Sequence, residues 1–238
     1  MQVLSPELLL CAYASGLFPM ANDRFDPVIH WIEPRRRGIL PLEAFHVPRS
    51  LRKVVRQARF EIRVDSAFAQ VIAACAASRP ERPRTWLNDE LIELYCALHE
   101  RGFAHSVEAW ADGRLAGGVY GVSLGAAFFG ESMFTRRRDA SKVALVELVE
   151  RLRAGGYRLL DTQFVTDHLR RFGAMEVSRP AYRTLLRDAI EMPATFYSDA
   201  GGVPSVAPWS SGGSSAGASG RSSGRRSSAS SQSTTQTS

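Results

Sequence analysis

The sequence predicts a mixed α/β fold (α+β), in which a small N-terminal domain precedes a core of mixed sheet flanked by helices. The second half of the chain alternates apolar strand-like runs with helical segments in the order β-β-β-α-β-α-β-α, which is typical of a sheet covered by helices. Asp112-Gly113 separates two of these runs and is a strong hairpin signal. Of the 238 residues, 45% are hydrophobic and 23% are charged, a globular balance that supports a packed core.

The first hundred residues alternate helical segments with irregular ones. Ser5 suits the N-cap of the first helix, Asn88 suits that of the last, and Gly102 suits its end. Residues 18–48 are rich in proline and predict only short extended pieces, and a strand is expected at 60–64. The expected helices are 5–17, 50–58, 66–77 and 89–101.

The rest of the chain predicts a more regular core. Strands are expected at 104–110, 114–121, 125–131, 157–164 and 174–178. Helices are expected at 141–153, from a Thr166 cap to Gly173, and from Pro180 to about 190. The boundary is expected near residue 102, so that the N-terminal domain covers 1–102 and the core covers 103–197.

Residues 198–238 form a Gly/Ser/Thr-rich tail with few large apolar side chains. Such a composition cannot bury enough apolar surface to offset the entropy lost on ordering, so it predicts disorder. From residue 201 onward the chain has three arginines and no acid, which leaves 27 basic and 24 acidic residues upstream. This balance is mildly basic, so only a local patch, and not the global charge, would indicate nucleic-acid binding.

Several classes of protein are disfavoured. No apolar run of about 18 residues predicts a membrane span. The N-terminus has no positive region of the kind that opens a secretory signal. The three cysteines lack C-x-x-C spacing and suit a reducing cytoplasm, and the five histidines show no metal-binding spacing. We therefore expect a cytoplasmic protein without a metal site.

A basic stripe is predicted on the helix at 50–58. Arg49, Arg52, Lys53 and Arg56 recur at i, i+3, i+4 and i+7, which places them on one helical face. Four neighbouring cations repel one another unless an anion faces them, and a phosphate backbone is the natural partner. The alternative is an ordinary solvated face.

Glu131 ends an apolar strand in the segment FFGESMF. A buried carboxylate is costly without a partner, so it needs a cation or a hydrogen-bond donor from the protein or from a substrate. The three arginines at 136–138 precede the next helix, whose N-terminus favours anions. The alternative for Glu131 is a structural ion pair.

The segment LLDTQF places two polar side chains in an apolar strand. Asp161 and Gln163 are two residues apart, so both point to the same face. Such a pair near the end of a central strand is a common site in open α/β sheets, although a core hydrogen-bond network is the alternative. Trp31 and Trp86 lie in irregular segments, where a tryptophan either stacks on a nucleobase or anchors its loop.

Seven segments in order resemble the leucyl/phenylalanyl-tRNA–protein transferase family: SGLFP, FHVPRSLRK, DSAFAQVIAACA, RTW, GVYGVSLGAAFFGESMF, ASK and LLDTQFVTDHLRRFGAMEVSR. The resemblance covers about residues 5–190. The combination of GESMF, ASK and LLDTQ is specific, whereas each piece alone is weak. A glycine-rich segment that usually precedes the first helix is missing, and the usual W-S-P-x-P-R reads WIEPRRRG here.

The resemblance implies a small N-terminal domain joined to a core similar to GNAT acetyltransferases. It implies the transfer of Leu, Phe or Met from aminoacyl-tRNA to proteins that begin with Arg or Lys, which marks them for degradation. No cofactor is expected, and we expect a monomer that does not bind membranes.

The resemblance also implies roles for residues. Asp161 and Gln163 match the catalytic pair, and Glu131 matches the acidic residue of the substrate site. Trp31 and Trp86 match the residues that contact the terminal adenosine of the tRNA.

Other residues match those with which the family binds its donor, the aminoacyl-tRNA. Val119, Phe128 and Leu145 match the wall of the pocket for the aminoacyl side chain. The basic stripe matches the region that grips the acceptor stem.

The expected chemistry needs little base strength, since an α-amine has a pKa of about 7.7–8.0. We expect Asp161 mainly to orient Gln163 and the incoming amine and to relay a proton, and together with Glu131 to favour a cationic N-terminal residue. The alternative is that a ribose hydroxyl of the tRNA shuttles the proton.

Two other functions remain as alternatives. An acyl-CoA-dependent N-acyltransferase would need a glycine-rich pyrophosphate loop, but residues 136–141 read RRRDAS. A non-catalytic RNA-binding module would explain the basic stripe and the tryptophans but not the polar pair in LLDTQF.

Overall fold

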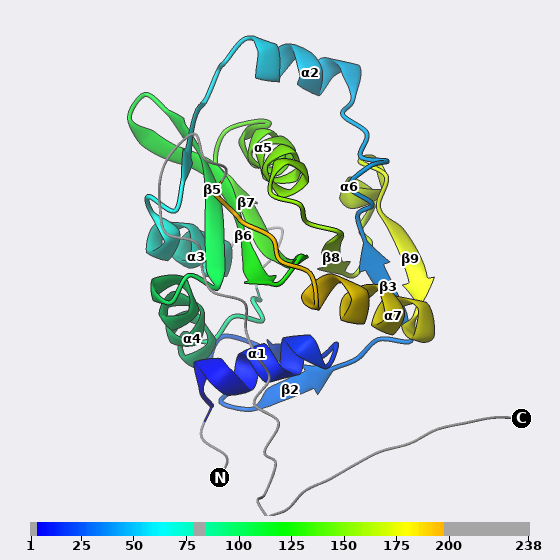
Figure 1. Cartoon of the computed structure of the whole chain (residues 1–238). Coiled ribbons are helices and arrows are strands. Elements are labelled where there is room, and N and C mark those ends of the chain that lie inside the picture. The colour runs from blue at the N-terminus through cyan, green and yellow to red at the C-terminus, as the bar shows by residue number, and fades with distance from the viewer. Residues whose placement is uncertain (1–3, 79–83, 198–238) are drawn as a thin grey trace, which may run out of the picture.

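The computed structural model describes residues 4–78 and 84–197, in which a seven-stranded sheet is flanked by helices (Figure 1). The strands of this sheet are β3 (Arg36–Ile39), β4 (Glu61–Val64), β5 (Ala104–Ala111), β6 (Arg114–Leu124), β7 (Ala127–Thr135), β8 (Leu159–Gln163) and β9 (Met175–Ser178). Their order is β4-β5-β6-β7-β8-β3-β9, and the β7–β8 pair is parallel while its neighbours are antiparallel. The predicted mixed α/β class is confirmed.

The helices begin and end close to the predicted residues. They are α1 (Pro6–Ala14), α2 (Arg49–Arg56), α3 (Phe68–Ala76), α4 (Asp89–Glu100), α5 (Ala140–Ala154), α6 (Asp167–Arg170) and α7 (Arg179–Ile190). The Ser5 hydroxyl accepts the N–H of Leu8 at 3.2 Å, and the Asn88 side chain accepts that of Leu91 at 2.9 Å. Both predicted N-caps are thus confirmed, because these side chains satisfy amides that have no partner within the helix.

Helices α3 and α5 cover opposite faces of the sheet. A Cβ atom on Gly117 would lie 2.7 Å from the Cβ of Ala140 in α5, whereas one on Gly118 would lie 3.3 Å from Val71 of α3. The sheet therefore has two cores. The first core, which includes Val71, packs α1, α3, α4 and α7 against the sheet, and the second core, which includes Ala140, packs α2 and α5 against it.

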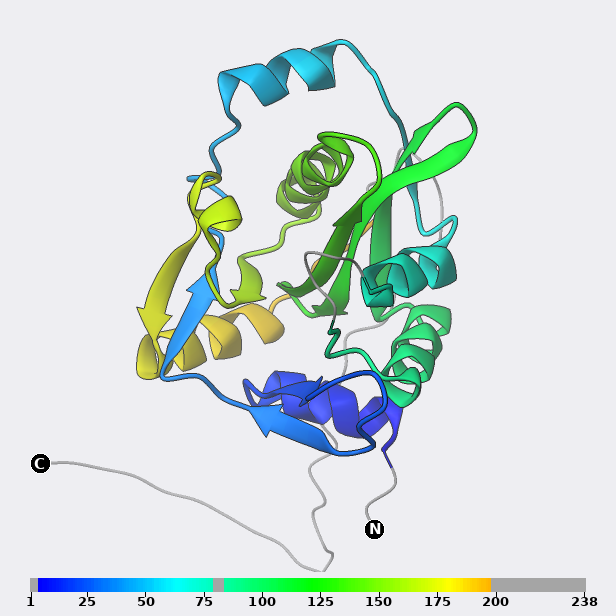
Figure 2. The ribbon, with the colours of Figure 1, turned by 180° about the vertical axis from the view of Figure 1, so that it is seen from behind.

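A two-stranded sheet of β1 (Phe18–Ala21) and β2 (Ile29–Ile32) lies beside α1. Seen from both sides, α1 and β2 lie at one end of the molecule and α2 lies at the other (Figure 1 and Figure 2). The domain division near residue 102 stays a prediction; β3 and β4 precede that residue and lie in the same sheet as the strands that follow it.

The β5–β6 hairpin turns at Asp112-Gly113, as predicted. Both residues have positive φ, 52° and 69°, which the favoured two-residue hairpin turn requires. The predicted end of β7 at residue 131 is wrong, because the strand continues to Thr135.

A β-bulge explains why β7 continues. Tyr120 pairs with Ser132 and Gly121 pairs with Gly130, which leaves Glu131 as the extra residue. Phe129 and Phe134 both lie in the first core although they are five residues apart, because the bulge changes which face the later residues point to.

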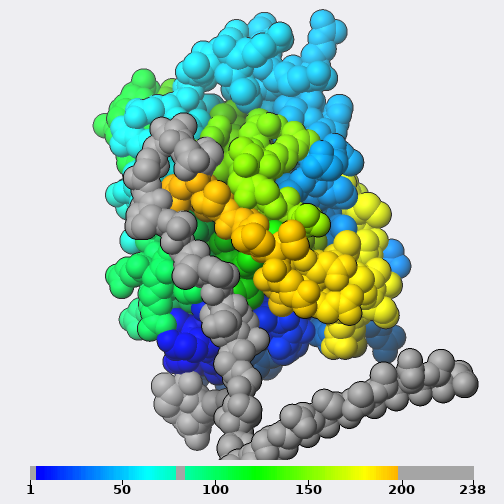
Figure 3. Space-filling model, viewed as in Figure 1, coloured from blue at the N-terminus to red at the C-terminus, as the bar shows by residue number. Residues whose placement is uncertain are grey.

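The segment that follows α7 runs along the surface beside α5 (Figure 3). Its Thr195 N–H donates to the Gly155 carbonyl at 3.0 Å, and the side chain of Phe196 is 3% exposed. The Phe196 ring stacks on His105 at 4.2 Å and on Phe128 at 5.5 Å between centroids. The tail predicted at 198–238 lies outside the described residues. Within the described ranges, no helix is long and apolar enough to cross a membrane.

Candidate active site

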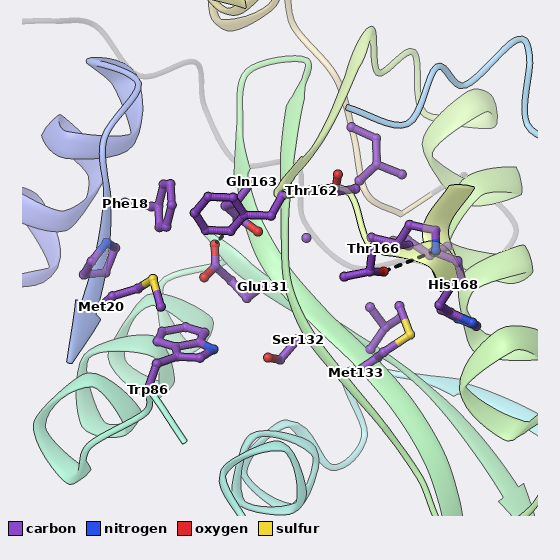
Figure 4. A pocket seen from close by; sticks show the side chains of 18 residues that line it. Phe18, Met20, Trp86, Glu131, Ser132, Met133, Thr162, Gln163, Thr166 and His168 are labelled. Carbon is purple, nitrogen blue, oxygen red and sulfur yellow. Dashed lines mark hydrogen bonds between the residues drawn. The ribbon is translucent and has the colours of Figure 1, made fainter. Parts of the chain in front are cut away.

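A cavity of about 320 Å³ opens where β7 and β8 separate. The two strands pair over only three residues, Ala127–Phe129 with Leu159–Asp161. Beyond these pairs, Gly130–Met133 of β7 and Thr162–Gln163 of β8 line opposite walls of the cavity. Glu131 and Gln163 lie between Phe18, Met20 and Trp86 on one side and Met133, Thr166 and His168 on the other (Figure 4).

Glu131 lies on the wall of the cavity and is held by three donors from three elements. Its Oε1 accepts the hydroxyl of Tyr13 at 2.7 Å and the amide Nε2 of Gln163 at 3.1 Å, and its Oε2 accepts the hydroxyl of Tyr95 at 3.0 Å. Burial raises the pKa of Glu131 to about 7, although the two tyrosine hydroxyls lower it. The expectation that this carboxylate needs donors is confirmed, and they come from the protein.

Asp161 is fully buried and does not line the cavity. Arg37, itself 1% exposed, donates to it through Nε at 3.0 Å and through Nη2 at 2.6 Å, and the Tyr182 hydroxyl donates at 2.6 Å. Burial lowers the pKa of Arg37, but the charge and hydrogen bonds of Asp161, together with the nearby Tyr182 and Glu131, outweigh this effect and the net shift is upward. This carboxylate therefore faces protein groups rather than the space for a substrate.

Gln163 connects the buried Asp161 to the cavity. Its backbone N–H donates to Oδ1 of Asp161 at 2.8 Å, while its side chain reaches Glu131. Gln163 has a φ of 55°, a left-handed conformation that is uncommon for a residue other than glycine. The hydrogen bond that the Gln163 N–H donates to Asp161 therefore fixes the turn that aims the Gln163 carboxamide into the cavity.

Three other predicted residues, Trp86, Val119 and Leu145, line the cavity, whereas Phe128 and Trp31 do not. Phe128 pairs with Leu160 of β8, which lines the cavity, so Phe128 lies next to the cavity but not in its wall. Its ring is fully buried and stacks on Phe196 instead.

Trp31 lies one strand away from the cavity. It pairs with Pro19 across the β1–β2 sheet, and Pro19 lines the cavity. Trp31 therefore lies next to the cavity wall and is partly buried against the first core.

The basic stripe lies on α2, as predicted, and its four side chains are exposed. Arg49, Arg52 and Arg56 line a second, shallow groove together with Val146 of α5. Within residues 4–78 and 84–197, none of the four cations forms an ion pair with a carboxylate. Their charge is thus not compensated by the protein groups that the structure describes.

Comparison with known protein families shows to which family the chain belongs. Residues 39–187 match the model of the leucyl/phenylalanyl-tRNA protein transferase, and residues 2–35 match the model of its N-terminal domain. The chain belongs to the leucyl/phenylalanyl-tRNA–protein transferase family. The resemblance found in the sequence is therefore confirmed.

Curated transferases of this family are similar over most of their length. One from Paramagnetospirillum magneticum is 59% identical and covers 84% of this chain and 96% of its own. One from Nitrobacter winogradskyi is 59% identical and covers 81% of this chain and 86% of its own. One from Phenylobacterium zucineum is 58% identical and covers 83% of this chain and 89% of its own. A solved structure, the C-terminal domain of a putative lysylphosphatidylglycerol synthetase from Agrobacterium fabrum, is 14% identical in sequence, with a TM-score of 0.37. The match covers 76% of this chain and 62% of the chain in that structure.

In this family member, sequence reasoning missed the residues that hold the two carboxylates. Arg37 pairs with Asp161. The sequence contained a signal for this burial: successive side chains of a strand point to opposite faces, so one of the neighbouring residues Arg36 and Arg37 must face inward if they lie in a strand. Tyr13, Tyr95 and Tyr182 come from three helices, and each sits in an apolar helical pattern that predicts burial but not a hydrogen bond.

Proposed function

We propose that this transferase moves Leu, Phe or Met from aminoacyl-tRNA to the N-terminal Arg or Lys of acceptor proteins, acting as a cytoplasmic monomer without a cofactor. The observation that carries the proposal is one cavity with an apolar interior and a polar wall. Val119, Met133, Leu145, Leu148 and Leu160 supply apolar surface, and Glu131 and Gln163 supply a carboxylate and a carboxamide. A peptide bond formed here would mark the acceptor for degradation.

The apolar part of the cavity suits the side chain of the donor amino acid. Burial contributes about 0.8 kcal/mol per methylene, which favours Leu, Phe and Met over small residues. Such a pocket discriminates only modestly between neighbours in size, so shape against β-branched side chains would be the sharper filter.

The polar wall suits the acceptor. Its amine attacks the ester carbonyl of the donor, and positioning alone supplies roughly 7–11 kcal/mol of such a barrier. Gln163 faces the cavity and is the residue we assign to contact the amine, with Asp161 acting through it as a positioning residue. The negative charge of Glu131 favours an acceptor that begins with a cationic residue, whereas the charge of Asp161 is paired with Arg37.

The tRNA is assigned to two surfaces. Trp86 lines the cavity and Trp31 lies beside it, and we assign both to stack on the terminal adenosine, a contact of roughly 1–3 kcal/mol per base. The basic stripe on α2 offers four exposed cations to the phosphates of the acceptor stem.

An acyl-CoA donor is less well supported. The residue before α5, Asp139, has a φ of 70° and pairs with Lys142 at 2.8 Å, so a carboxylate stands where a pyrophosphate would need backbone amides. Titration of acetyl-CoA by calorimetry tests this alternative, and we expect no heat of binding.

The decisive assay supplies labelled Phe-tRNA and two peptides that differ only in a first residue of Arg or Asp. We expect label on the Arg peptide alone. Binding of Phe-tRNA without transfer to either peptide would instead support the non-catalytic RNA-binding module.

A further inference from the structure

Three oxygen-bearing groups form a closed triangle on the wall of the cavity. The hydroxyls of Tyr13 and Tyr95 lie 2.7 Å apart, and they lie 2.7 Å and 3.0 Å from the two carboxyl oxygens of Glu131. All three distances are within the range of O–H···O hydrogen bonds. Both tyrosines are fully buried, and burial raises their pKa well above the usual value, so each hydroxyl keeps its hydrogen.

Counting hydrogens shows that the triangle can hold Glu131 in both protonation states. When Glu131 is ionised, the hydroxyls of Tyr13 and Tyr95 both donate to it, which lowers its pKa, and only the contact between the two hydroxyls is left without a hydrogen. When Glu131 is protonated, its O–H donates to Tyr95, Tyr95 donates to Tyr13, and Tyr13 donates to the other oxygen of Glu131. Each group then donates once and accepts once, so the triangle stabilises both protonation states.

We propose that Glu131 accepts a proton from the α-ammonium of the acceptor protein, and that Tyr13 and Tyr95 are positioning residues that stabilise it before and after this step. This inference rests on the proposed transferase function. An N–H bond of the ammonium breaks, its electron pair stays on nitrogen, and an O–H bond forms on Glu131. The neutral amine then attacks the ester, its second proton goes to the departing ribose oxygen, and Glu131 returns its proton to water after the product leaves.

The environment of Glu131 matches this exchange. Burial raises its pKa to about 7, close to the value of about 7.7–8.0 for an α-amine, so the proton moves between groups of similar affinity. The charge of Asp161 raises the pKa further, while the hydroxyls of Tyr13 and Tyr95 and the charge of Arg37 lower it.

Other groups around Glu131 do not replace it as the acceptor. The Gln163 amide donates to Glu131 from β8, and the hydroxyls of Tyr120 and Tyr182 are buried nearby and keep their protons because burial raises their pKa. Asp161 is sealed by Arg37 and does not line the cavity. Glu131 is therefore the carboxylate that an acceptor amine in the cavity would meet.

The alternative hypothesis is that Glu131 only attracts the cationic side chain of the acceptor's first residue. The test compares wild type and Glu131→Gln at pH 7 with two Arg-starting peptides, one with its natural amine and one with a terminal aminooxy group, which is neutral at this pH. Since only about a tenth to a sixth of a natural amine is neutral at pH 7, we expect kcat/KM to fall about six- to tenfold with the natural peptide. With the aminooxy peptide we expect a fall of less than about twofold.

The outcomes distinguish the proton-acceptor role of Glu131 from the transferase function of the protein. Equal losses with both peptides would overturn the proton-acceptor role while leaving the transferase function intact. Failure of the wild-type protein to label either peptide would instead reject the proposed function.

A second measurement tests the two tyrosines without removing the carboxylate. Tyr13→Phe deletes a hydroxyl that lowers the pKa of Glu131, so the rising limb of kcat/KM against pH moves to higher pH. Tyr95→Phe acts in the same direction. The matched control is Tyr157→Phe, which removes a buried hydroxyl bonded to Ser123 at 2.6 Å, away from the cavity, and leaves the limb in place. An unchanged limb in both test variants would overturn the positioning role.

Discussion

At the scale of single residues, Asp161 illustrates how burial changes the role of a carboxylate. Its oxygens accept from Arg37, Tyr182 and the N–H of Gln163, so neither is free to meet a substrate. Substitution of this residue therefore affects the stability of the fold and the aim of Gln163 together.

We expect Asp161→Ala to lower the free energy of unfolding by about 3–5 kcal/mol, because it leaves the buried guanidinium of Arg37 without an anion. Asp161→Asn keeps an acceptor oxygen and should cost less. Asp161→Ala should reduce transfer, because the Gln163 N–H loses the acceptor that fixes its turn, and Asp161→Asn should reduce transfer less. Urea denaturation and the transfer assay measure the two effects.

The matched control is Asp188→Ala. The ion pair of Asp188 with Arg187 in α7 is exposed, so its loss should cost less than about 1 kcal/mol. Near-wild-type transfer by both Asp161 variants would contradict any role for this carboxylate in aiming Gln163.

Leu145 tests the assignment of the apolar wall. Leu145→Trp fills part of the cavity, so transfer of Phe should fall more than transfer of Leu, because the larger side chain needs more of the remaining space. Competition between the two charged tRNAs measures the ratio. Glu150→Trp, on the exposed face of the same helix, is the control, and equal losses of Phe and Leu transfer in Leu145→Trp would count against this wall.

At the scale of elements, α2 presents its charge away from the second core, on which it packs. Its Leu51 and Val54 are buried against the second core, which leaves the basic stripe facing solvent. A helix that is held by two apolar side chains and whose four cations pair with no carboxylate among the described residues is suited to a polyanion.

We expect Arg52→Ala/Lys53→Ala to weaken the binding of Phe-tRNA and to reduce the slope of log K against log salt by about 2, since each lost phosphate contact changes it by about 0.9. The KM for the peptide should not change. Titration of Phe-tRNA at several salt concentrations measures the slope.

The control for α2 is Arg187→Ala, which removes an exposed arginine from α7, at the other side of the molecule (Figure 1). An unchanged salt slope in the α2 double variant would show that the basic stripe does not contact phosphates.

Elements with local signals were predictable from the sequence. The caps at Ser5 and Asn88 and the turn at Asp112-Gly113 act within a few residues, so the sequence alone predicts them. The bulge at Glu131 is different, because it depends on how β6 pairs with β7 and the segment FFGESMF contains no local signal that predicts it. For that reason the predicted end of β7 was wrong.

The site was predictable in part for the same reason. Spacing brought Glu131 and Gln163 to attention, and both line the cavity. The burial of Asp161 depends on Arg37 and Tyr182, which are 124 and 21 residues away in the chain, and no local pattern predicts such contacts. The roles of these residues stay predictions until the variants above are measured.

At the scale of the whole molecule, the C-terminal segment closes the second core. Phe196 stacks between His105 and Phe128, and the guanidinium of Arg151 donates to its carbonyl at 3.2 Å. The Tyr197 hydroxyl donates to Asp65, whose carboxylate also bonds His105 at 2.8 Å. These contacts join the end of the described chain to β5, to β7 and to the residue that follows β4.

We therefore expect truncation to have opposite results on the two sides of this segment. A chain that ends at Tyr197 keeps every contact of Phe196, so its Tm and its transfer activity should match those of the full chain. A chain that ends at Pro193 loses the buried ring and should lose about 3–5 kcal/mol, or roughly 6–20 °C in Tm at about 2–4 °C per kcal/mol. Phe196→Ala in the full chain separates loss of the ring from loss of the chain end, and differential scanning calorimetry compares all four proteins. Equal Tm values for the chains ending at Pro193 and Tyr197 would mean that this segment does not stabilise the second core.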